Sequence, residues 1–373
     1  MSKLEKLLAE LCPDGVRKLS IADICNISRG RIMSKDYIKE NAGDYPVYSS
    51  QTENEGKLGL INSFDYDGEY LTWTTDGANA GTVFYRMGKF SITNVCGLLK
   101  VTDEHVLTKY LYYTLNVEAP SYVNSGMGNP KLMSNVMGRI KVAIPPLPVQ
   151  SEIVRILDNL TELTTELTTE LTTELTDRKK QYEYYREILI NKHRYQERKL
   201  SSLCSINRGK RVTKKDLSDE FEFEVFQNSL ISQGKYYKAN RNKNTTFLIS
   251  AGAAGEVGYS KNDFWAADDC LYFDSEKINQ RYLYYVLKTK QQFLYDRVRK
   301  ASVPRISKGH VGEVMIPYAS LAEQQRIVDI LDRFDTLCND ISKGLPAEIA
   351  ERQKQYEYYR NKLLTFKNIN AEV

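Results

Sequence analysis

The longest run of regularly spaced apolar residues in the chain lies between positions 151 and 192. Apolar side chains recur there at every third or fourth position, which places them on one face of an α-helix. Prolines at positions 145, 146 and 148 end the preceding segment, so we expect this helix to run from Ser151 to about Lys192. Its apolar positions are Ile153, Ile156, Leu157, Leu160, Leu163, Leu167, Leu171, Leu175, Tyr182, Tyr185 and Leu189.

A second pattern of the same kind fills residues 323–373. Gly344 and Pro346 interrupt it. Because proline lacks a backbone N–H and clashes with the preceding turn, we expect the helix to kink or restart here, with Pro346 as the first residue of the new stretch. The apolar positions are Ile327, Ile330, Leu331, Phe334, Leu337, Ile341, Leu345, Ile349, Tyr356 and Tyr359.

Both helices belong to an internal repeat with a period near 174 residues. The segment Lys180–Arg186 (Lys-Gln-Tyr-Glu-Tyr-Tyr-Arg) recurs letter for letter at Lys354–Arg360. Ile153–Asp158 matches Ile327–Asp332 at the same offset. A repeat of this length indicates two copies of one structural unit.

The segments before the helices match more loosely. Their paired stretches are Ile24–Gly30 with Leu203–Gly209, Tyr110–Tyr113 with Tyr282–Tyr285, and Cys96 with Cys270. We expect the paired cysteines to be small core residues. Glu69–Thr74 and Glu222–Phe226 alternate like strands between turns rich in Gly and Asn. We therefore predict two α/β (α+β) domains in tandem pseudo-repeat, each followed by a long helix.

Four copies of Thr-Glu-Leu-Thr fill residues 161–176. Low complexity and disorder are one interpretation of this run. Leucine at every fourth position, however, lies close to one helical face. Threonine is a poor helix former, so the helix is marginal alone and a partner must cover the leucines. The matched helix of the second half fits as an antiparallel coiled-coil partner about a pseudo-two-fold axis.

The predicted organisation has four parts. They are a first globular domain (1–149), a central helix with the tetrapeptide repeats (150–192), a second globular domain (193–322) and a C-terminal helix (323–373). At 1.5 Å per residue the central helix spans ~60 Å. It is therefore expected to act as a spacer between the two domains.

Composition narrows the class of protein. The 52 basic and 48 acidic residues leave a net charge of +4, which permits nucleic-acid binding without requiring it. Six widely spaced cysteines and three histidines predict neither a disulfide framework nor a metal site. The N-terminal residues lack the apolar core of a signal peptide, and no apolar run has membrane-spanning length, so we expect a cytoplasmic protein.

Motifs that carry catalysis are missing from the sequence. The only Pro-Pro pair follows Ile144, where an amino-methyltransferase motif has Asn or Asp. No GxxxxGK[ST] phosphate loop occurs. Glu55-Gly-Lys57 fits the end of a nuclease motif, but this tripeptide arises easily by chance and has no counterpart in the second half. We predict no catalytic residues.

Five segments resemble the specificity (S) subunit of type I restriction–modification systems. The resemblance covers essentially the whole chain, and it is specific in the helical segments and weak in the globular ones. The segments are Cys12-Pro-Asp-Gly, Ile144-Pro-Pro-Leu-Pro-Val-Gln, the tetrapeptide run, Gly344-Leu-Pro-Ala-Glu, and the paired Lys-Gln-Tyr-Glu-Tyr-Tyr-Arg.

This resemblance implies a large complex. One S subunit joins two modification subunits, which bind S-adenosylmethionine and methylate adenine at N6, and restriction subunits add ATP- and magnesium-dependent translocation and cleavage. The S subunit reads a split target in double-stranded DNA with two target recognition domains, the two globular domains here. Its helices act as a ruler and as a docking surface. The chain itself is then expected to bind no cofactor.

Candidate DNA contacts are the polar residues of repeat-matched loops. Bases are read mainly by Arg, Lys, Asn and Gln, and phosphates are held by Lys, Arg and Ser. We predict base reading by Gln51, Gln227 and Asn228. Backbone contacts are predicted for Arg29, Lys57, Arg208 and Lys235. The further candidates are Arg31, Ser49, Ser50, Lys131, Lys210, Arg211 and Arg305; for each, a solvated loop or an ion pair is the alternative.

The tyrosine clusters of the repeated helix segment are candidates for a different surface. They resemble stacking platforms, but their helical spacing favours the helix-pair core and the partner interface. This predicted interface comprises Leu163, Leu167, Leu171, Leu175, Tyr182, Tyr185, Leu337, Ile341, Leu345, Ile349, Tyr356 and Tyr359. Two other functions stay open: a stand-alone DNA-modifying or DNA-cleaving enzyme, and a coiled-coil scaffold with no nucleic-acid role.

Overall fold

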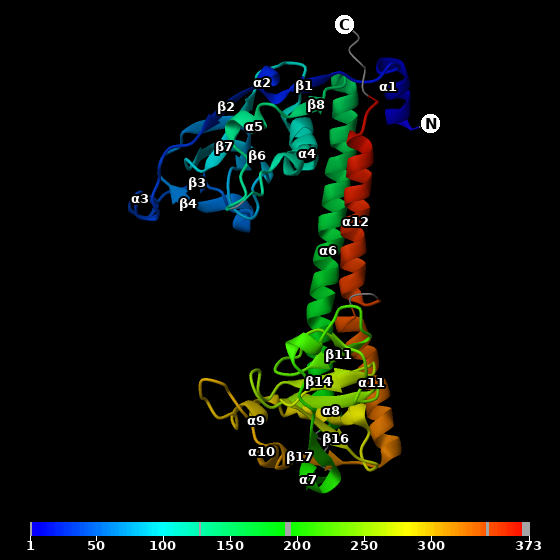
Figure 1. Cartoon of the computed structure of the whole chain (residues 1–373). Helices are drawn as coiled ribbons and strands as arrows, with labels where there is room; N and C mark the ends of the chain where they lie inside the picture. The colour runs from blue at the N-terminus through cyan, green and yellow to red at the C-terminus, as the bar shows by residue number, and fades with distance from the viewer. Residues whose placement is uncertain (1, 127, 191–194, 341–342, 368–373) are drawn as a thin grey trace. The chain divides into compact units, whose positions relative to one another are not determined.

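The computed structural model describes residues 2–126, 128–190, 195–340 and 343–367. The chain divides into two units, each with its own globular part and its own stretch of paired long helices (Figure 1). Unit 1 comprises Met1–Thr169 and Ala350–Val373, and unit 2 comprises Glu170–Ile349. The sequence therefore enters unit 1, passes through unit 2 and returns to unit 1.

Unit 1 is built on a six-stranded sheet. Its strands, in spatial order, are β2 (Cys25–Arg29), β7 (Cys96–Val101), β5 (Tyr66–Thr74), β6 (Val83–Ile92), β3 (Tyr45–Tyr48) and β4 (Lys57–Ile61). All neighbours are antiparallel except β3 and β6. Helix α4 (Thr108–Glu118) packs on β5 and β6. The core between them contains Leu71, Trp73, Leu99, Leu111 and Leu115.

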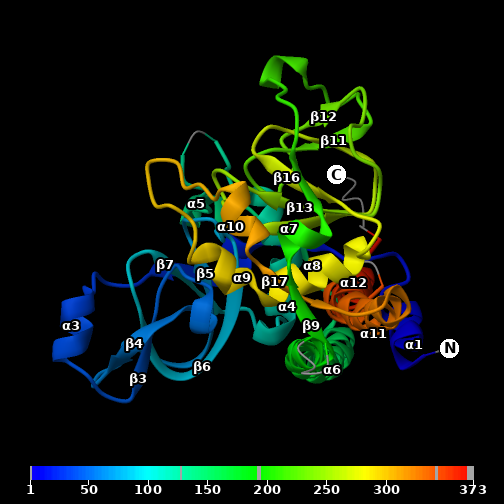
Figure 2. The same cartoon turned by 90° about the horizontal axis from the view of Figure 1, so that it is seen from below.

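Smaller elements complete unit 1. β1 (Lys18–Ser20) pairs with β8 (Lys141–Ala143). The short helices are α1 (Lys3–Leu11), α2 (Ile21–Ile24), α3 (Lys35–Glu40), η1 (Glu53–Gly56), η2 (Ala119–Tyr122) and α5 (Ser134–Met137). Two views at right angles place α3, β3 and β4 at the end of this unit that is remote from α1 and α4 (Figures 1 and 2).

Unit 2 has the same plan with smaller sheets. Its four-stranded sheet has the order β10 (Ser205–Arg208), β16 (Cys270–Asp274), β13 (Thr245–Ile249), β14 (Val257–Ser260). A three-stranded sheet has the order β12 (Lys235–Tyr236), β11 (Phe223–Phe226), β15 (Phe264–Ala266), and β17 (Met315–Tyr318) pairs with β9 (Gln196–Lys199). The other elements are α7 (Leu200–Leu203), η3 (Lys214–Asp216), α8 (Gln280–Thr289), α9 (Gln291–Tyr295) and α10 (Lys308–Gly312).

The repeat is visible in the pairing of the strands. β11 and β15 are parallel in unit 2, as β3 and β6 are in unit 1. Helix α8 packs on β13 and β14 as α4 packs on β5 and β6. The predicted tandem of α/β (α+β) domains is confirmed.

The first long helix, α6 (Leu147–Ile190), has 44 residues and includes the whole tetrapeptide run. It begins four residues before the expected Ser151, because Pro148 fits in a first turn where its missing N–H has no partner anyway. The second is split into α11 (Leu321–Asn339) and α12 (Leu345–Leu364). The predicted restart is confirmed, but α12 begins at Leu345, so Pro346 is its second residue and not its first.

In each unit the long helices run antiparallel. In unit 1, the start of α6 at Val149, Ile153 and Leu157 clusters with Leu363 and Phe366 at the end of the chain. Further along, the Thr161 hydroxyl lies 3.1 Å from the Tyr356 hydroxyl. In unit 2, the ring of Tyr185 stacks on Phe334 of α11 with centroids 5.6 Å apart, while Ile190 clusters with Ile327.

The predicted leucine stripe is wrong at its first position. Leu163 is 60% exposed, whereas Leu171 is buried. A unit of four residues turns the helix by about 400°, so each leucine is displaced about 40° from the one before. Thr164 and Thr168 are half-buried where the leucines leave the covered face. Their hydroxyls need an acceptor there, and that of Thr168 donates to the carbonyl oxygen of Thr164 at 2.8 Å.

Some of the other residues predicted to lie between the paired helices are buried or half-buried, and others are exposed. Tyr185 and Tyr359 are 39% and 49% exposed, so neither is a core residue of the pair. Ile341 lies outside the described residues. Those that are buried or half-buried are Leu167, Leu171, Leu175, Tyr182, Leu337, Leu345, Ile349 and Tyr356.

One glutamine in each unit joins the globular part to the start of its long helix. The side chain of Gln150 donates to the carbonyl oxygens of Pro145 and His105, both at 2.7 Å, and accepts from Leu107 N. Gln324 donates to the carbonyl oxygen of Ala319 at 2.9 Å and accepts from Asn279 N at 2.7 Å. Both are fully buried, so each clamp fixes its domain on its helix.

Candidate nucleic-acid interface

In unit 1, Arg29 and Arg31, two of the predicted DNA contacts, flank Gly30 at the end of β2. A Cβ on Gly30 would lie 1.9 Å from the carbonyl oxygen of Ile92, so only glycine permits this approach. Arg29 Nε donates to Ser134 Oγ at 3.2 Å. Arg31 Nε pairs with Asp65 at 3.0 Å, and hydrogen bonding to Tyr37 and then Asp65 raises the pKa of Arg31. The close contact thus brings both cations to one edge of the sheet, each with a polar partner.

The loop after β3 turns its polar groups inward. Ser50 Oγ donates to the carbonyl oxygen of Val95 and accepts from Thr75 N at 3.0 Å. Ser49 Oγ accepts from Thr93 Oγ1 at 2.8 Å. Gln51 Nε2 donates to the carbonyl oxygen of Lys57 at 2.7 Å. These bonds make the loop rigid and use donors that base reading would require.

Lys131 lies in unit 1 between η2 and α5. Its backbone is bridged to Asp76 and to Asn124, and its side chain is exposed. Leu132 N donates to the carbonyl oxygen of Thr75 at 2.9 Å, next to the amide that Ser50 accepts from. Lys131 therefore lies close to the loop after β3.

Unit 2 repeats the glycine contact. A Cβ on Gly209 would lie 2.2 Å from the carbonyl oxygens of Ala266 and Ala267. The flanking side chains of Arg208, Lys210 and Arg211 are all exposed. Within the described part of the chain, none of these three makes an ion pair. They are available to an external anion.

The loop after β11 is the structural counterpart of the loop after β3. Ala267 N donates to the carbonyl oxygen of Phe226 as Thr93 N does to that of Tyr48, both at 2.9 Å. The alignment of Ser49-Ser50-Gln51 with Gln227-Asn228-Ser229 is thereby confirmed. Gln227 Nε2 lies 3.4 Å from Asp268 Oδ1, and Asn228 is exposed.

Three loops of unit 2 meet around Asn228. Its carbonyl oxygen accepts from Ala253 N at 2.9 Å. Next to Ala253, Gly252 N donates to the carbonyl oxygen of Pro304 at 3.1 Å. Arg305 follows Pro304, and its Nη1 lies 3.7 Å from Asp269 Oδ1 with the side chain 59% exposed. The loop between α9 and α10 that carries Arg305 stands out from the body of unit 2 (Figure 2).

Lys57 and Lys235, which the sequence predicts to be equivalent, do not occupy the same position in the strand pairing of their units. Lys57 faces Tyr48 across β3 and β4. Lys235 faces Glu224 across β11 and β12, two residues before Phe226, the counterpart of Tyr48. The segments between the paired strands, 49–56 and 227–234, both have eight residues, so the difference lies in the pairing register, which sequence alone could not show. Both lysines are exposed.

Two neighbours of Asn228 were missed by the sequence reasoning. Gln233 Nε2 donates to Asn228 Oδ1 at 2.5 Å. Ile231, between them in the chain, is 79% exposed. Their only sequence signal is a turn rich in Ser and Gly, which does not say that residues 228 and 233 meet. Gln233 thus adds an amide to the polar surface of this loop, and Ile231 adds an exposed apolar side chain.

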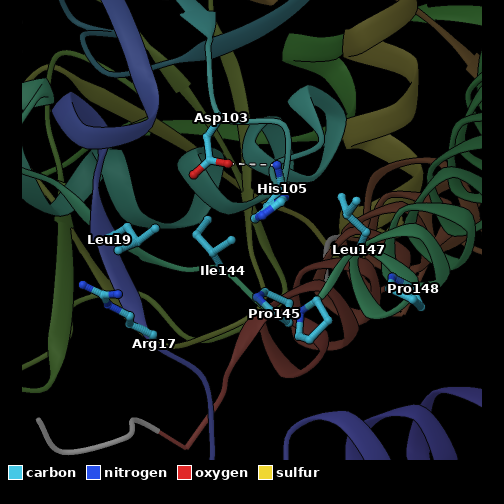
Figure 3. Close-up of a pocket in the computed structure, with 9 residues that line it drawn as sticks. Arg17, Leu19, Asp103, His105, Ile144, Pro145, Leu147 and Pro148 are labelled. Carbon is cyan, nitrogen blue, oxygen red and sulfur yellow. Dashed lines mark hydrogen bonds between the residues drawn. The ribbon is translucent and has the colours of Figure 1, made fainter.

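A cavity of about 540 Å³ lies elsewhere in unit 1 (Figure 3). Its lining includes Arg17, Leu19, Asp103, His105 and Ile144, together with the prolines before α6. The one hydrogen bond drawn there joins His105 N to Asp103 Oδ1 at 2.8 Å. The backbone amide of His105 donates to the Asp103 carboxylate and the imidazole takes no part, so this bond gives His105 no role as an acid or base.

The remaining chemical expectations concern thiols, metals and membranes. Cys96 and Cys270 are buried, as expected of core residues, and burial raises the pKa of Cys96 to about 12. The described residues contain no cluster of three or more His, Cys, Asp or Glu suited to a metal ion. In the same residues, no helix is both long and apolar enough to cross a membrane.

Comparison with known proteins agrees with this architecture. A Mycoplasma pneumoniae protein named as a type I specificity subunit is 34% identical over 361 residues, 93% of this chain and 97% of that protein. The specificity subunit of the type I restriction enzyme MpnII, from the same organism, is 45% identical over 185 residues, 50% of this chain and 55% of that protein.

Solved structures share the fold at low sequence identity. One described as a type I restriction–modification assembly aligns with a TM-score of 0.68 at 13% identity, over 95% of this chain and 98% of that one. The S subunit from M. genitalium aligns with a TM-score of 0.57 at 16% identity, over 93% of this chain and 96% of that one. The family described as type I restriction modification DNA specificity domain matches residues 13–177 and again 192–351, and the chain belongs to this family.

Proposed function

We propose that this chain is the DNA-reading subunit of a type I restriction–modification complex and that it is not itself a catalyst. One observation carries the proposal. Each unit sets an equivalent polar loop, Ser49–Gln51 or Gln227–Ser229, beside a strand end held by a glycine and flanked by basic side chains. Basic groups that hold phosphates next to polar groups that reach bases are what sequence-specific DNA binding requires.

The basic groups suit the backbone of the duplex. Arg208, Lys210 and Arg211 are exposed around Gly209, and Arg305 is mostly exposed on a projecting loop. Neutralising phosphates releases counterions, so this part of the binding carries affinity but no sequence information. In unit 1, the partners Ser134 and Asp65 orient Arg29 and Arg31 for the same task.

Two units of one chain imply a target in two parts. We infer that each unit reads one half-site and that the bases between the half-sites are not read. The exposed tyrosines Tyr184 and Tyr358 occupy equivalent positions on α6 and α12 and offer apolar surface to modification subunits. S-adenosylmethionine, ATP and magnesium are then bound by modification and restriction subunits, not by this chain.

The proposal is tested by selecting duplexes from a random library with the full chain. A bipartite motif whose binding weakens steeply with salt is expected. Replacing Lys210 by Ala should weaken binding to all sequences alike and lower the salt slope by about one. A single short continuous motif would contradict the two-part target.

Two other functions predict different results. A stand-alone enzyme would transfer labelled methyl groups from S-adenosylmethionine, or cut DNA with magnesium, when the purified chain is assayed alone. A coiled-coil scaffold would show no salt-sensitive DNA binding at all.

A further inference from the structure

The loop after β11 presents two amide side chains as one composite group. Gln233 Nε2 donates to Asn228 Oδ1 at 2.5 Å, so the two amides are joined edge to edge. Asn228 is exposed and Gln233 is half-buried. Within the described part of the chain, no other hydrogen bond engages Asn228 Nδ2 or Gln233 Oε1. The pair therefore offers an amide donor from one residue and a carbonyl acceptor from the other.

The backbone beneath this pair is held in place. Ser229 Oγ donates to the carbonyl oxygen of Ile231 at 2.9 Å, and Ser232 Oγ donates to that of Gly234 at 2.9 Å. Below Asn228, a Cβ on Gly252 would lie 2.7 Å from the Asn228 carbonyl oxygen, and Gly252 has φ +84°. A rigid support of this kind lowers the entropy lost when side chains bind a ligand.

The donor and acceptor match one base edge in the major groove. Adenine presents N7, an acceptor, beside N6–H, a donor. Guanine presents two acceptors, N7 and O6, and would leave the carbonyl oxygen of Gln233 without a partner. Exchanging N and O in both amides keeps one free donor and one free acceptor, so the match does not depend on that assignment.

An apolar side chain stands beside the amide pair. Ile231 is 79% exposed, at the tip of the turn between the two amides. Leu230, next to it, packs into the core cluster of Phe226 and Phe247, so Ile231 is directed away from that core. In the major groove, the apolar feature that distinguishes bases is the 5-methyl group of thymine, the partner of adenine.

We propose that Asn228, Gln233 and Ile231 read one A·T base pair in the half-site bound by unit 2. Asn228 Nδ2 donates to adenine N7, Gln233 Oε1 accepts from adenine N6–H, and Ile231 contacts a thymine methyl group of that pair or the adjacent one. This inference rests on the proposed DNA-reading function. It adds Gln233 and Ile231 to the predicted base reader Asn228, and it assigns one base pair of the target.

Unit 1 does not present the same group. Ser50, the counterpart of Asn228, is engaged by Val95 and Thr75, and Gln51 donates to the carbonyl oxygen of Lys57. The loop after β3 therefore offers fewer free side-chain donors than the loop after β11. Changes at Asn228, Gln233 or Ile231 should affect one half-site only.

The experiment uses the full chain and duplexes selected from a random library. Gln233→Leu should lose the preference for A·T at one position of one half-site and keep the other half-site. Gln181→Leu, which removes an exposed amide from α6 in the same unit, is the matched control and should select the wild-type motif. Thermal unfolding of each variant shows whether it is folded.

Chemically altered DNA tests the contacts on the wild-type protein itself. At the identified position, 7-deazaadenine removes the N7 acceptor and should weaken wild-type binding by about tenfold. Asn228→Ala should be insensitive to that change. Uracil in place of thymine removes the methyl group and should weaken the wild type but not Ile231→Ala.

The outcomes separate the inference from the function on which it rests. If the wild type selects a bipartite motif that Asn228→Ala and Gln233→Leu also select, the composite reader is wrong and the proposed function stands. If Asn228→Ala and Gln233→Leu instead lose affinity equally for all sequences, these residues contact the DNA backbone and do not read bases. A wild-type chain without sequence preference would overturn both the proposed function and this inference.

Discussion

The hydroxyl group of Tyr113 donates a hydrogen bond to Asp158 Oδ1 at 2.7 Å, which joins α4 to α6 within unit 1. Lys109 Nζ pairs with the other oxygen of Asp158 at 2.8 Å. The repeat gives unit 2 the same anchor, in which Tyr285 and Arg281 of α8 meet Asp332 of α11. In each unit, the helix that packs on the main sheet is thus tied to a long helix through this aspartate, and in unit 2 Asp335 adds a second ion pair with Arg281.

Removing this carboxylate in unit 2 should loosen the anchor. Arg281 is 10% exposed and would keep only Asp335 as an ionic partner, at 2.7 Å. Since Asp332 is 44% exposed, we expect Asp332→Ala to cost about 1–2 kcal/mol, below the cost of breaking a fully buried pair. Urea unfolding measures this, with exposed Asp329→Asn on α11 as the control. Equal stability of the two variants would show that Asp335 alone holds Arg281.

The glycines at the strand ends should be needed for both folding and DNA binding. In Gly209→Ala the new methyl group would lie 2.2 Å from two carbonyl oxygens, so β10 must move away from residues 266–267. We expect a loss of about 1–3 kcal/mol in stability and weaker DNA binding through displaced Arg208 and Lys210.

Gly309→Ala provides the control for that substitution. Gly309 lies in α10, where a Cβ would be 3.7 Å from its nearest neighbour, so alanine is tolerated. Alanine there should leave stability unchanged or raise it, because it restricts the unfolded chain. Unfolding and filter binding of both variants would show whether close approach is the cause. A Gly209→Ala protein as stable as Gly309→Ala would rule it out.

The sequence predicted the features that depend on local spacing or on exact repetition. Helical periodicity predicted α6, and the looser match between the globular segments aligned Asn228 with Ser50, which lies 178 residues earlier. The sequence did not predict the order of the strands, because β3 and β6 are separated by 34 residues and pair in parallel. The hydrogen bond between Asn228 and Gln233 was not predicted either, since a turn of Ser and Gly residues fits many conformations.

The exposure of Leu163 shows a second limit. Leucines spaced by four residues drift around a helix of 3.6 residues per turn, and the displacement accumulates over the four units. Of the four leucines in the run, only Leu171 is buried. The periodicity therefore predicted the helix correctly and the covered residues only in part.

In acid, unit 1 should lose the ion pair between Glu152 of α6 and Lys3 of α1. Hydrogen bonds from Arg155 and then Lys3 lower the pKa of Glu152 to about 2, from an ordinary value of 4.5. A lowered carboxyl pKa stabilises the folded state fully above pH 4.5, and this contribution is lost as the pH falls from there toward 2. The stability difference between wild type and Glu152→Gln should be present at pH 6 and vanish toward pH 2. Glu166→Gln, at an exposed position on the same helix, is the matched control.

The tetrapeptide run should set the number of unread bases between the half-sites. Deleting one unit, Thr173–Thr176, shortens α6 by ~6 Å and rotates the rest of the helix by about 40° relative to a whole turn. Because B-DNA rises 3.4 Å per base pair, we expect a spacer shorter by about one or two base pairs, with both half-site sequences unchanged. Motif selection with the full-length variant measures the spacer directly.

Folding of this variant depends on the length of the deleted unit. Four residues equal the leucine spacing, so Leu171 and the residues after the deletion keep nearly their original faces, and the break between α11 and α12 can absorb the surplus turn of the partner. Deleting only Thr173 and Glu174 would rotate everything beyond by about 200° and expose Tyr182, so that control should lose stability. A folded four-residue deletant that selects the original spacing would show that α6 tethers the two units without measuring the DNA.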